Sequence, residues 1–467
     1  MSYKLVCLAL AVGLSIALAP AESAEQAPSP VNASGTAAET GTADAAAAPA
    51  PGEIVGERFA VHGQATVVEQ LTAPFHAPYG GAHSLSPRRG DETLDMTLYL
   101  GARLWPGAEA WVNPEIDQGF GLDDTVGLAG FPSGEAYKVG RKQPYWRLPR
   151  LFVRQTVDLG GARQPLAAAV NQLGGFQSAN RWVFTLGKFA VTDIFDSNQY
   201  AHDARNDFLN WTAIDAGTFD YAADAWGYTV GAAAEWYQGT WAVRAGVFDL
   251  SNVPNSETLD PGLRELQWVA ELERRYTPMG MPGKVLMTLF DSRARMALLD
   301  AALSGAQAGE NINAALVDAR GYRSRAGVSL SLEQQLSSDL GVFARAGKAG
   351  GNVETYEFTD ADRTVAAGVS LQGRRWGRAD DTVGLAAIVN GISAERERFL
   401  NAGGLGVLVG DGRLPHPGAE QILETYYRWA LLPWARLTFD YQEAINPGYN
   451  RDRGPVPIFA ARLHAQF

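Results

Sequence analysis

The chain has 467 residues, of which 46% are hydrophobic and 19% are charged, and its formal net charge is −12 at pH 7. This acidic balance argues against nucleic acid as a partner, because a nucleic-acid-binding surface needs clustered positive charge. No apolar run reaches the roughly 18 residues that a transmembrane helix requires.

The first 24 residues are typical of a secretory signal peptide. Lys4 precedes an apolar stretch over residues 5–18, and small residues suited to cleavage follow, with Ala21 and Ala24 as the two candidate sites. We therefore expect residues 1–24 to be removed on export.

The segment after the signal, residues 25–53, is dominated by Ala, Pro, Thr and Ser. It offers too little large apolar surface to offset the entropy of ordering, so it is predicted to be a disordered lead-in. The only cysteine, Cys7, lies in the signal peptide, and the mature protein is therefore expected to have no disulfide.

The remaining chain, residues 54–467, is predicted to be one domain built from strands. In LDMTLYLGARLW (residues 94–105) every second residue is apolar, whereas Asp95, Thr97 and Tyr99 share the other side. This period of two indicates a strand with one apolar and one polar face. Sixteen segments are predicted as strands: 59–70, 93–105, 108–115, 149–159, 181–188, 227–237, 240–249, 265–275, 284–291, 322–333, 340–348, 363–373, 381–390, 421–430, 434–443 and 458–467.

The connections between these segments alternate between long and short, and only residues 160–180 break the rhythm. An outer-membrane barrel has this pattern, with an even strand count, short periplasmic turns and long extracellular loops. The predicted fold class is therefore all-β, a transmembrane antiparallel barrel of sixteen strands. A soluble antiparallel sheet with one solvent-exposed face also alternates apolar and polar residues, and it is the alternative to the membrane barrel.

The parity of charged residues predicts which face meets lipid. An Arg or Lys facing lipid at mid-bilayer costs about 2 to 4 kcal/mol, so charged residues within strands should face the lumen. Arg154, Glu235 and Arg244 have that parity and are candidate pore-lining residues.

The final segment, IFAARLHAQF, places Phe459, Leu463 and Phe467 on one face, and the chain stops on an aromatic residue. Such a terminal strand resembles the signal that bacterial outer-membrane barrels present to their assembly machinery. The expected partners are therefore outer-membrane lipid and, through Phe467, that machinery.

The longest connection, residues 189–226, contains the polar stretch DIFDSNQYAHDARNDFLNW. Its position resembles that of the third outer loop of sixteen-stranded porins, which folds into the barrel and narrows it. On this basis we expect a pore constriction that binds solute through Asp193, Asp196, Asn198, His202, Asp203, Arg205, Asn210 and Trp211.

Four blocks of sequence resemble the carbohydrate-selective porins of the OprB family. They are residues 187–238 around the polar stretch, LWPGAEAWVNPEIDQGFG (104–121), RLPRLFVRQT (147–156) and NPGYNRDRGPVPIFAARLHAQF (446–467). The resemblance implies a sixteen-stranded barrel in the bacterial outer membrane, a monomer rather than a trimer, that lets mono- or small oligosaccharides diffuse into the periplasm.

Sugar passage also fits the side-chain chemistry. Sugars offer hydroxyls to charged hydrogen-bonding groups and C–H faces to aromatic rings, and Trp111, Trp211 and Trp226 are the aromatic candidates. A porin for small anionic solutes is the alternative, because lumen arginines would also attract anions.

An outer-membrane hydrolase is a less favoured hypothesis for the function of the chain. His202 and Asp203 could belong to a catalytic triad, but adjacent residues seldom orient one another, and the chain has no G-x-S-x-G motif. The six histidines form no H-E-x-x-H pair. We therefore expect no catalytic residues, no cofactor and no metal.

Overall fold

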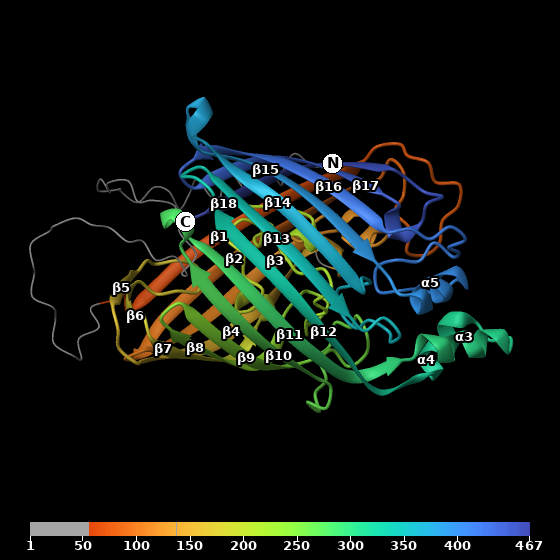
Figure 1. Ribbon diagram of the computed structural model, residues 1–467, viewed down its shortest axis with the longest axis horizontal. Coiled ribbons are helices and arrows are strands. Elements are labelled where there is room, and N and C mark those ends of the chain that lie inside the picture. Colours follow the sequence, from red (N-terminus) through yellow and green to blue (C-terminus); the bar gives the residue numbers. More distant parts are fainter. Residues whose placement is uncertain (1–55, 137) are drawn as a thin grey trace, which may run out of the picture.

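The computed structural model describes residues 56–136 and 138–467. Both the predicted signal peptide and the predicted lead-in, residues 1–53, lie outside the described residues. The described chain folds into one closed antiparallel barrel of sixteen strands (Figure 1). The predicted fold class is thus confirmed.

The barrel strands follow one another around the wall in chain order. They are β1 (Phe59–Thr72), β2 (Gly90–Trp105), β3 (Ala108–Gly119), β4 (Arg141–Asp158), β7 (Arg181–Phe189), β8 (Thr229–Gln238), β9 (Trp241–Asp249), β10 (Leu266–Tyr276), β11 (Gly283–Ala297), β12 (Arg320–Gln335), β13 (Leu340–Ala349), β14 (Arg363–Gly373), β15 (Arg378–Gly391), β16 (Glu420–Leu432), β17 (Ala435–Ile445) and β18 (Val456–Gln466).

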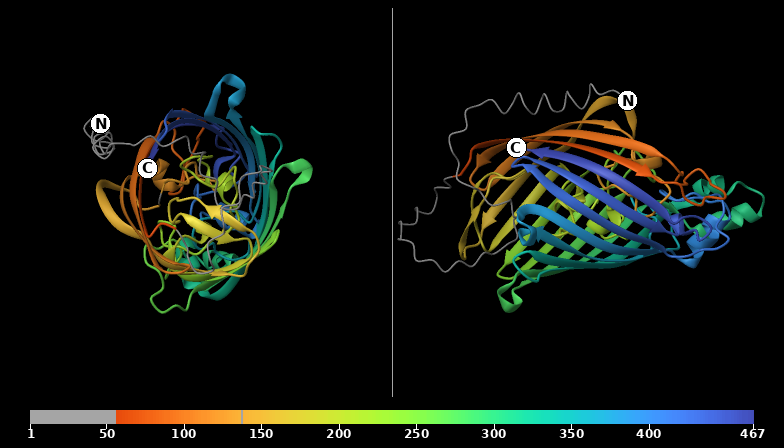
Figure 2. Two further views of the ribbon diagram at one scale, coloured as in Figure 1. Left: turned by 90° about the vertical axis from the view of Figure 1, so that its left-hand side faces the viewer. Right: turned by 90° about the horizontal axis from the view of Figure 1, so that it is seen from above.

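Pairing between the first and last strands closes the sheet. The β1–β18 register runs from Thr72 opposite Ile458 to Gln64 opposite Gln466. Beyond it, the backbones of Gly63 and Phe467 exchange two hydrogen bonds of 3.1 and 3.0 Å. The C-terminal residue therefore takes part in closing the ring, which Figure 2 shows in the view from the end of the barrel.

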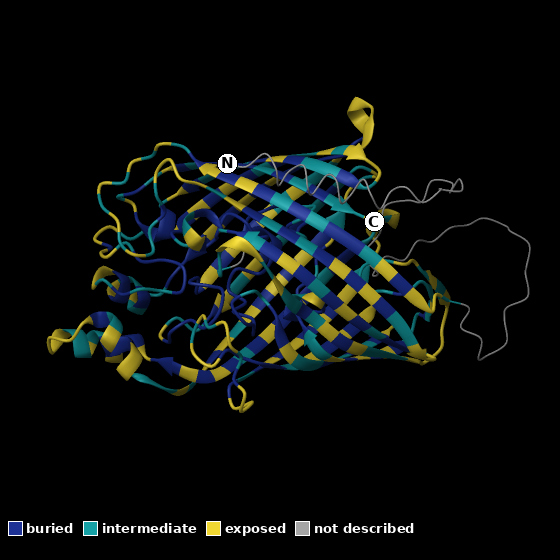
Figure 3. Cartoon of the chain, turned by 180° about the vertical axis from the view of Figure 1, so that it is seen from behind, coloured by how far each residue is buried: buried dark blue, intermediate teal, exposed yellow. Residues whose placement is uncertain are grey.

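Exposed and buried residues alternate over the outer wall in a chequerboard (Figure 3). In β10, Trp268 and Leu272 are exposed, whereas Gln267 and Glu271 are fully buried on the inner side. The apolar row faces outward and the polar row inward, as expected for a sheet whose outer face meets lipid.

All sixteen predicted segments coincide with barrel strands, although some strands are longer than predicted. β4 begins at Arg141 and not at residue 149, and β11 continues to Ala297 and not to residue 291. The extra part of β4, RKQPYWRL, has no alternation of apolar and polar residues. Backbone pairing extends β4 through this segment, although it leaves no periodic signal in the sequence.

The connection that broke the rhythm of loop lengths, residues 160–180, contains a separate two-stranded hairpin. Its strands are β5 (Arg163–Leu166) and β6 (Gly175–Ser178), which pair with each other and not with the barrel. The hairpin accounts for the unusual length of this connection.

The two ends of the barrel differ (Figure 1). The end that carries the long connections, here called the loop end, bears helices α3 (Leu299–Gln307), α4 (Ile312–Asp318) and α5 (Ala394–Asn401). The opposite end, the turn end, bears the short hairpin connections and the β5–β6 hairpin. No helix in the described ranges is both long and apolar enough to span a membrane.

We predict that the loop end faces the cell exterior. Cysteines introduced singly at the exposed positions Gln307 and Ala402 of the loop end should react with a membrane-impermeant thiol reagent on intact cells. The matched turn-end variant Ser338→Cys should stay protected until the cells are permeabilised. Labelling of Ser338→Cys with protection of both loop-end positions would reverse the orientation.

Candidate functional site

The segment between β7 and β8, residues 190–228, is anchored to the inner face of the barrel wall. The backbone N–H of Asp196 donates to Glu271 on β10 (2.7 Å), and the Asn198 side chain donates to Ser331 on β12 (3.2 Å). On β13, Arg345 donates to the Ala213 carbonyl (2.6 Å). Contacts on three strands fix this segment in position, and more strands contribute further anchors.

Aromatic packing adds a second set of anchors inside the barrel. Phe131 stacks on Trp211 with ring centroids 5.3 Å apart, and Phe208 meets Tyr426 of β16 edge to face at 5.0 Å. These rings are buried. The barrel interior therefore contains an apolar cluster that holds residues 190–228, in addition to the polar lumen that parity predicts.

A small polar cavity of about 90 Å³ lies where this segment meets β2, β3 and β4. Carboxylates and guanidinium groups dominate its lining, with two aromatic rings beside them. We call it the charged pocket, and its lining residues are Asp95, Glu115, Asp117, Gly134, Glu135, Ala136, Arg147, Arg205, Trp226 and Tyr228.

Arg205 is the centre of one half of the charged pocket. Its Nη2 lies 2.6 Å from Oε1 of Glu135 and 3.5 Å from Oδ1 of Asp95. Burial raises the pKa of Glu135 well above its usual value, and the charge of Arg205 opposes this rise. Burial therefore favours the neutral form of Glu135, and the adjacent guanidinium group of Arg205 offsets only part of that effect.

Arg147 of β4 is the centre of the other half. It pairs with Glu115 and Asp117 of β3, and its guanidinium lies 5.0 Å from the Tyr228 ring centroid and 5.7 Å from that of Trp226. The indole N–H of Trp226 donates to the hydroxyl of Tyr145 at 2.9 Å. The pocket therefore sets ionised groups directly beside fixed aromatic faces.

Asp193 adjoins the charged pocket through a neighbouring arginine. Nε and Nη2 of Arg150 donate to its two carboxylate oxygens at 2.8 and 2.7 Å, and Arg150 also lies over the Tyr228 ring at 4.9 Å. Burial raises the pKa of Asp193, but the charge and hydrogen bonds of Arg150 outweigh it and the net pKa is lowered.

Four other residues predicted for the constriction anchor residues 190–228. Asp196 accepts from the backbone of Ala216 at 2.6 Å, and Asn198 bonds to β12. Asn210 caps the short helix α2 (Trp211–Ile214) and donates to Gln442 of β17 at 3.0 Å. Trp211 is the ring stacked on Phe131.

His202 and Asp203 lie in a turn of the same segment. Asp203 accepts from the backbone N–H of Arg205 at 2.9 Å and from the Asn206 amide at 2.8 Å, so it shapes the turn that presents Arg205. Nδ1 of His202 is 3.7 Å from Asp215. Among the described residues, no group of three or more His, Cys, Asp or Glu side chains is arranged to hold a metal ion.

The three strand residues predicted to line the pore lie in other parts of the lumen. Arg154 donates to the carbonyl of Asn171, in the connection between β5 and β6, at 2.8 Å. Glu235 and Arg244 pair at 3.1 Å, and Arg244 also contacts Glu271 at 2.7 Å. Of the eleven residues predicted to bind solute, Arg205 alone lines the charged pocket, and Trp226, named separately as an aromatic candidate, lines it as well.

Sequence reasoning did not select most of the pocket residues. Asp95 lies on the polar face of its predicted strand, and Glu115 and Arg147 lie in segments that resemble the OprB family, so the sequence carries a signal for these three. Glu135 lies in irregular chain between β3 and β4, where no periodicity marks a residue as lumen-facing. Glu135 can be identified as a pocket residue only from the folded structure.

We predict that Arg345 stabilises residues 190–228 without lining the charged pocket. It is fully buried and forms an ion pair with Asp196 (3.5 Å), and breaking a buried pair typically costs about 3 to 5 kcal/mol. Arg345→Ala should therefore accelerate proteolytic cleavage within residues 190–228 of the assembled barrel. The matched variant Arg398→Ala, at an exposed ion pair with Asp300, should change little. Unaltered protection in Arg345→Ala would rule out the anchoring role.

Comparisons with solved structures show the same fold in other outer-membrane channels. The high-pH structure of OprB from Pseudomonas putida is similar with a TM-score of 0.66 at 16% identity, covering 88% of this chain and 94% of that chain. The outer-membrane channel DcaP of Acinetobacter baumannii has a TM-score of 0.51 at 10% identity, covering 88% and 97%. At such identities the likeness establishes the fold alone. No curated protein matches the chain.

The family model adds the evidence that the distant structures lack. The model described as carbohydrate-selective porin, OprB family, matches residues 82–467, which include every barrel strand after β1. The chain therefore belongs to the OprB family of carbohydrate-selective porins and is a sugar-selective channel of the bacterial outer membrane.

Proposed function

We propose that mono- or small oligosaccharides diffuse passively into the periplasm through the charged pocket, and that residues 190–228 narrow the barrel there. The observation that carries this proposal is the lining itself. Carboxylates and guanidinium groups stand beside the rings of Trp226 and Tyr228 in one cavity. This combination matches a sugar, which has hydroxyls at its edge and C–H groups on its faces.

The energies suit a channel that recognises its solute and then releases it. A hydrogen bond to a charged group contributes about 1.5 to 3 kcal/mol. The sugar loses comparable hydrogen bonds to water as it enters. Its net binding free energy is therefore the small difference between the bonds gained from the protein and the bonds lost to water. The charged side chains of the pocket are already paired with one another. A passing sugar therefore replaces some of these pairings with hydrogen bonds to its hydroxyls, and the side chains pair again when it leaves.

The lining favours neutral sugars over the alternative solute, a small anion. It has four carboxyl groups, on Asp95, Glu115, Asp117 and Glu135, against the two guanidinium groups of Arg147 and Arg205. Burial favours the neutral form of Glu135, and a neutral carboxyl group can donate a hydrogen bond to a sugar hydroxyl as well as accept one. Because each guanidinium group already has acidic partners, the pocket offers an anion no unpaired positive charge.

We assign different roles to the residues that the sequence selected. Arg205 contacts the sugar, and Asp193 orients Arg150 at the edge of the pocket. Asp196, Asn198, Asn210 and Trp211 hold residues 190–228 in place, while His202 and Asp203 shape its turn. Arg154, Glu235 and Arg244 lie along the remaining path through the lumen.

The family is a class of channels and not of enzymes, and we infer no catalysis for this chain. We further propose that the barrel functions as a monomer and that the terminal strand ending in Phe467 is recognised by the assembly machinery. The exposed Phe467 ring, with the β1–β18 closure behind it, supports that last proposal.

Trp226→Ala should weaken the block of single-channel current by glucose or maltose. Losing one aromatic platform removes about 0.5 to 1.5 kcal/mol, so the blocking constant should rise roughly twofold to twelvefold. The matched control is Trp376→Ala, which removes an exposed ring at the turn end. Sugar block that is unchanged in Trp226→Ala, or equally weakened in the control, would refute the assignment of the pocket.

A further inference from the structure

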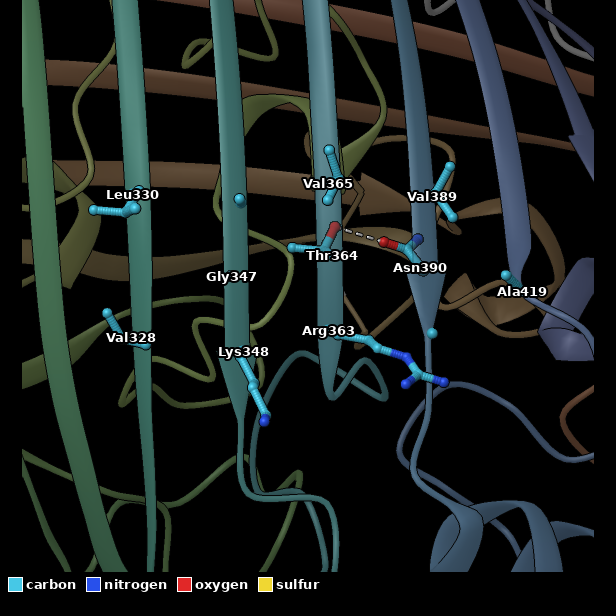
Figure 4. Close-up of a pocket in the computed structure, with 12 residues that line it drawn as sticks. Val328, Leu330, Gly347, Lys348, Arg363, Thr364, Val365, Val389, Asn390 and Ala419 are labelled. Atoms are coloured by element: carbon cyan, nitrogen blue, oxygen red, sulfur yellow. Dashed lines mark hydrogen bonds between the residues drawn. The ribbon is translucent and has the colours of Figure 1, made fainter.

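A groove of about 450 Å³ lies on the outer face of the barrel over β12 to β15 and reaches Ala419, the residue before β16. Its apolar lining residues Val328, Leu330, Val365 and Val389 are all exposed. Figure 4 shows these side chains on neighbouring strands, with Lys348 and Arg363 level with Val328 and nearer the connecting loops than Leu330, Val365 and Val389. The groove lies on the part of the wall that faces lipid.

The shape of the groove follows from one small residue between larger ones. In the sheet register, Leu330 is opposite Ala346, Ala346 is opposite Val365, and Val365 is opposite Val389. The short side chain of Ala346 therefore forms a floor between taller apolar walls. Such a channel matches the width of an extended hydrocarbon chain better than that of a folded segment.

Two positive charges stand at one end of the groove. Lys348 and Arg363 are both exposed and lie directly opposite each other in the β13–β14 register. Like charges at directly opposed positions destabilise a sheet. Throughout residues 56–136 and 138–467 neither side chain has an ion-pair partner, and Arg363 donates only to the carbonyl of Ile392 at 3.1 Å. The acid next in sequence, Asp362, is turned inward and paired with Arg396 and Arg325.

The charges lie toward the loop end, and the apolar floor lies deeper in the wall. β13 ends at Ala349 and β14 begins at Arg363, so the connection between them emerges one or two residues beyond the charged pair. From the membrane surface inward, the order is therefore positive charge and then apolar groove. An anionic amphiphile in the loop-end leaflet has its negative headgroup at the membrane surface and its hydrocarbon chain deeper, which matches this order of charge and apolar groove.

We propose that this groove is a specific site for a lipid of the loop-end leaflet whose phosphate headgroup has a net negative charge. Lys348 and Arg363 bind the phosphate, which cancels their mutual repulsion through charge-assisted hydrogen bonds. One acyl chain lies over Ala346 between Leu330 and Val365. The site is separate from the sugar path, because it lies on the opposite face of the barrel wall.

The test uses the full barrel reconstituted with equal amounts of phosphorylated lipid A and phosphatidylcholine, and then extracted in mild detergent. Native mass spectrometry should find one retained lipid A per barrel. The double variant Lys348→Gln, Arg363→Gln should lower retention by about 30-fold, the loss expected for two surface charges. Ala346→Leu keeps both charges and fills the floor, and it should also lower retention.

The matched control is Arg293→Gln, Arg295→Gln, which removes two exposed arginines of β11 outside the groove. It should retain lipid A as the unaltered protein does. Equal loss of lipid A in the control would show that any pair of basic residues near the loop end binds the lipid, and that the groove is not a specific site. Full retention by Ala346→Leu would show that the acyl chain does not lie in the groove. Barrel dimers that these groove substitutions abolish, with no lipid bound, would show that a second copy of the chain is the occupant.

Discussion

The structure depends on the requirement that every backbone N–H and C=O inside a membrane be hydrogen-bonded. Lipid offers no partner for these groups, so a sheet that spans it must have no free edge. Pairing of β1 with β18 meets this requirement, and the bonds between Gly63 and Phe467 complete it. Closure then leaves each strand with one row of side chains for lipid and one for the lumen.

The long connections have backbone N–H groups without a strand partner, and acidic side chains of the strands and of the connections themselves supply acceptors for them. Buried carboxylates accept several of these groups at once. Glu420 accepts from Ala129, Gly130 and Gly448, whereas Asp360 accepts from Val407, Leu408 and Val409. Because a carboxylate has several lone pairs, one side chain can replace a missing stretch of ladder. The acidic composition of the chain is thus partly a requirement of folded loops.

The arginines of the lumen differ in how far they are buried. Where guanidinium groups are fully buried, as at Arg345 and Arg325, they hold connections to the wall. At Arg147, which lies near the rings of Trp226 and Tyr228, and at Arg205 the guanidinium groups stay partly exposed, and we propose that these two meet the solute. The sequence pattern does not separate the two kinds, since the distinction depends on how far the loops cover each side chain.

A segment of this chain can be predicted from its sequence where its residues meet two different surroundings in alternation. Lipid on one side and polar lumen on the other impose a period of two, and this period located all sixteen strands. No such environment acts on residues 190–228 or on the chain around Glu135. Arg205 was selected because it lies in an unusually polar stretch, but Glu135, its partner at 2.6 Å, comes from a separate connection. Contacts such as Phe131 on Trp211 depend on that long-range packing too.

The most direct test of the sugar path is an experimental structure of the barrel at a saturating concentration of a blocking sugar. We expect the sugar ring to lie against Trp226 or Tyr228, with hydroxyls about 2.6 to 3.2 Å from the carboxylates and guanidinium groups of the charged pocket. Sugar bound only elsewhere in the lumen, for instance at the Glu235–Arg244 pair, with the charged pocket empty, would contradict the account.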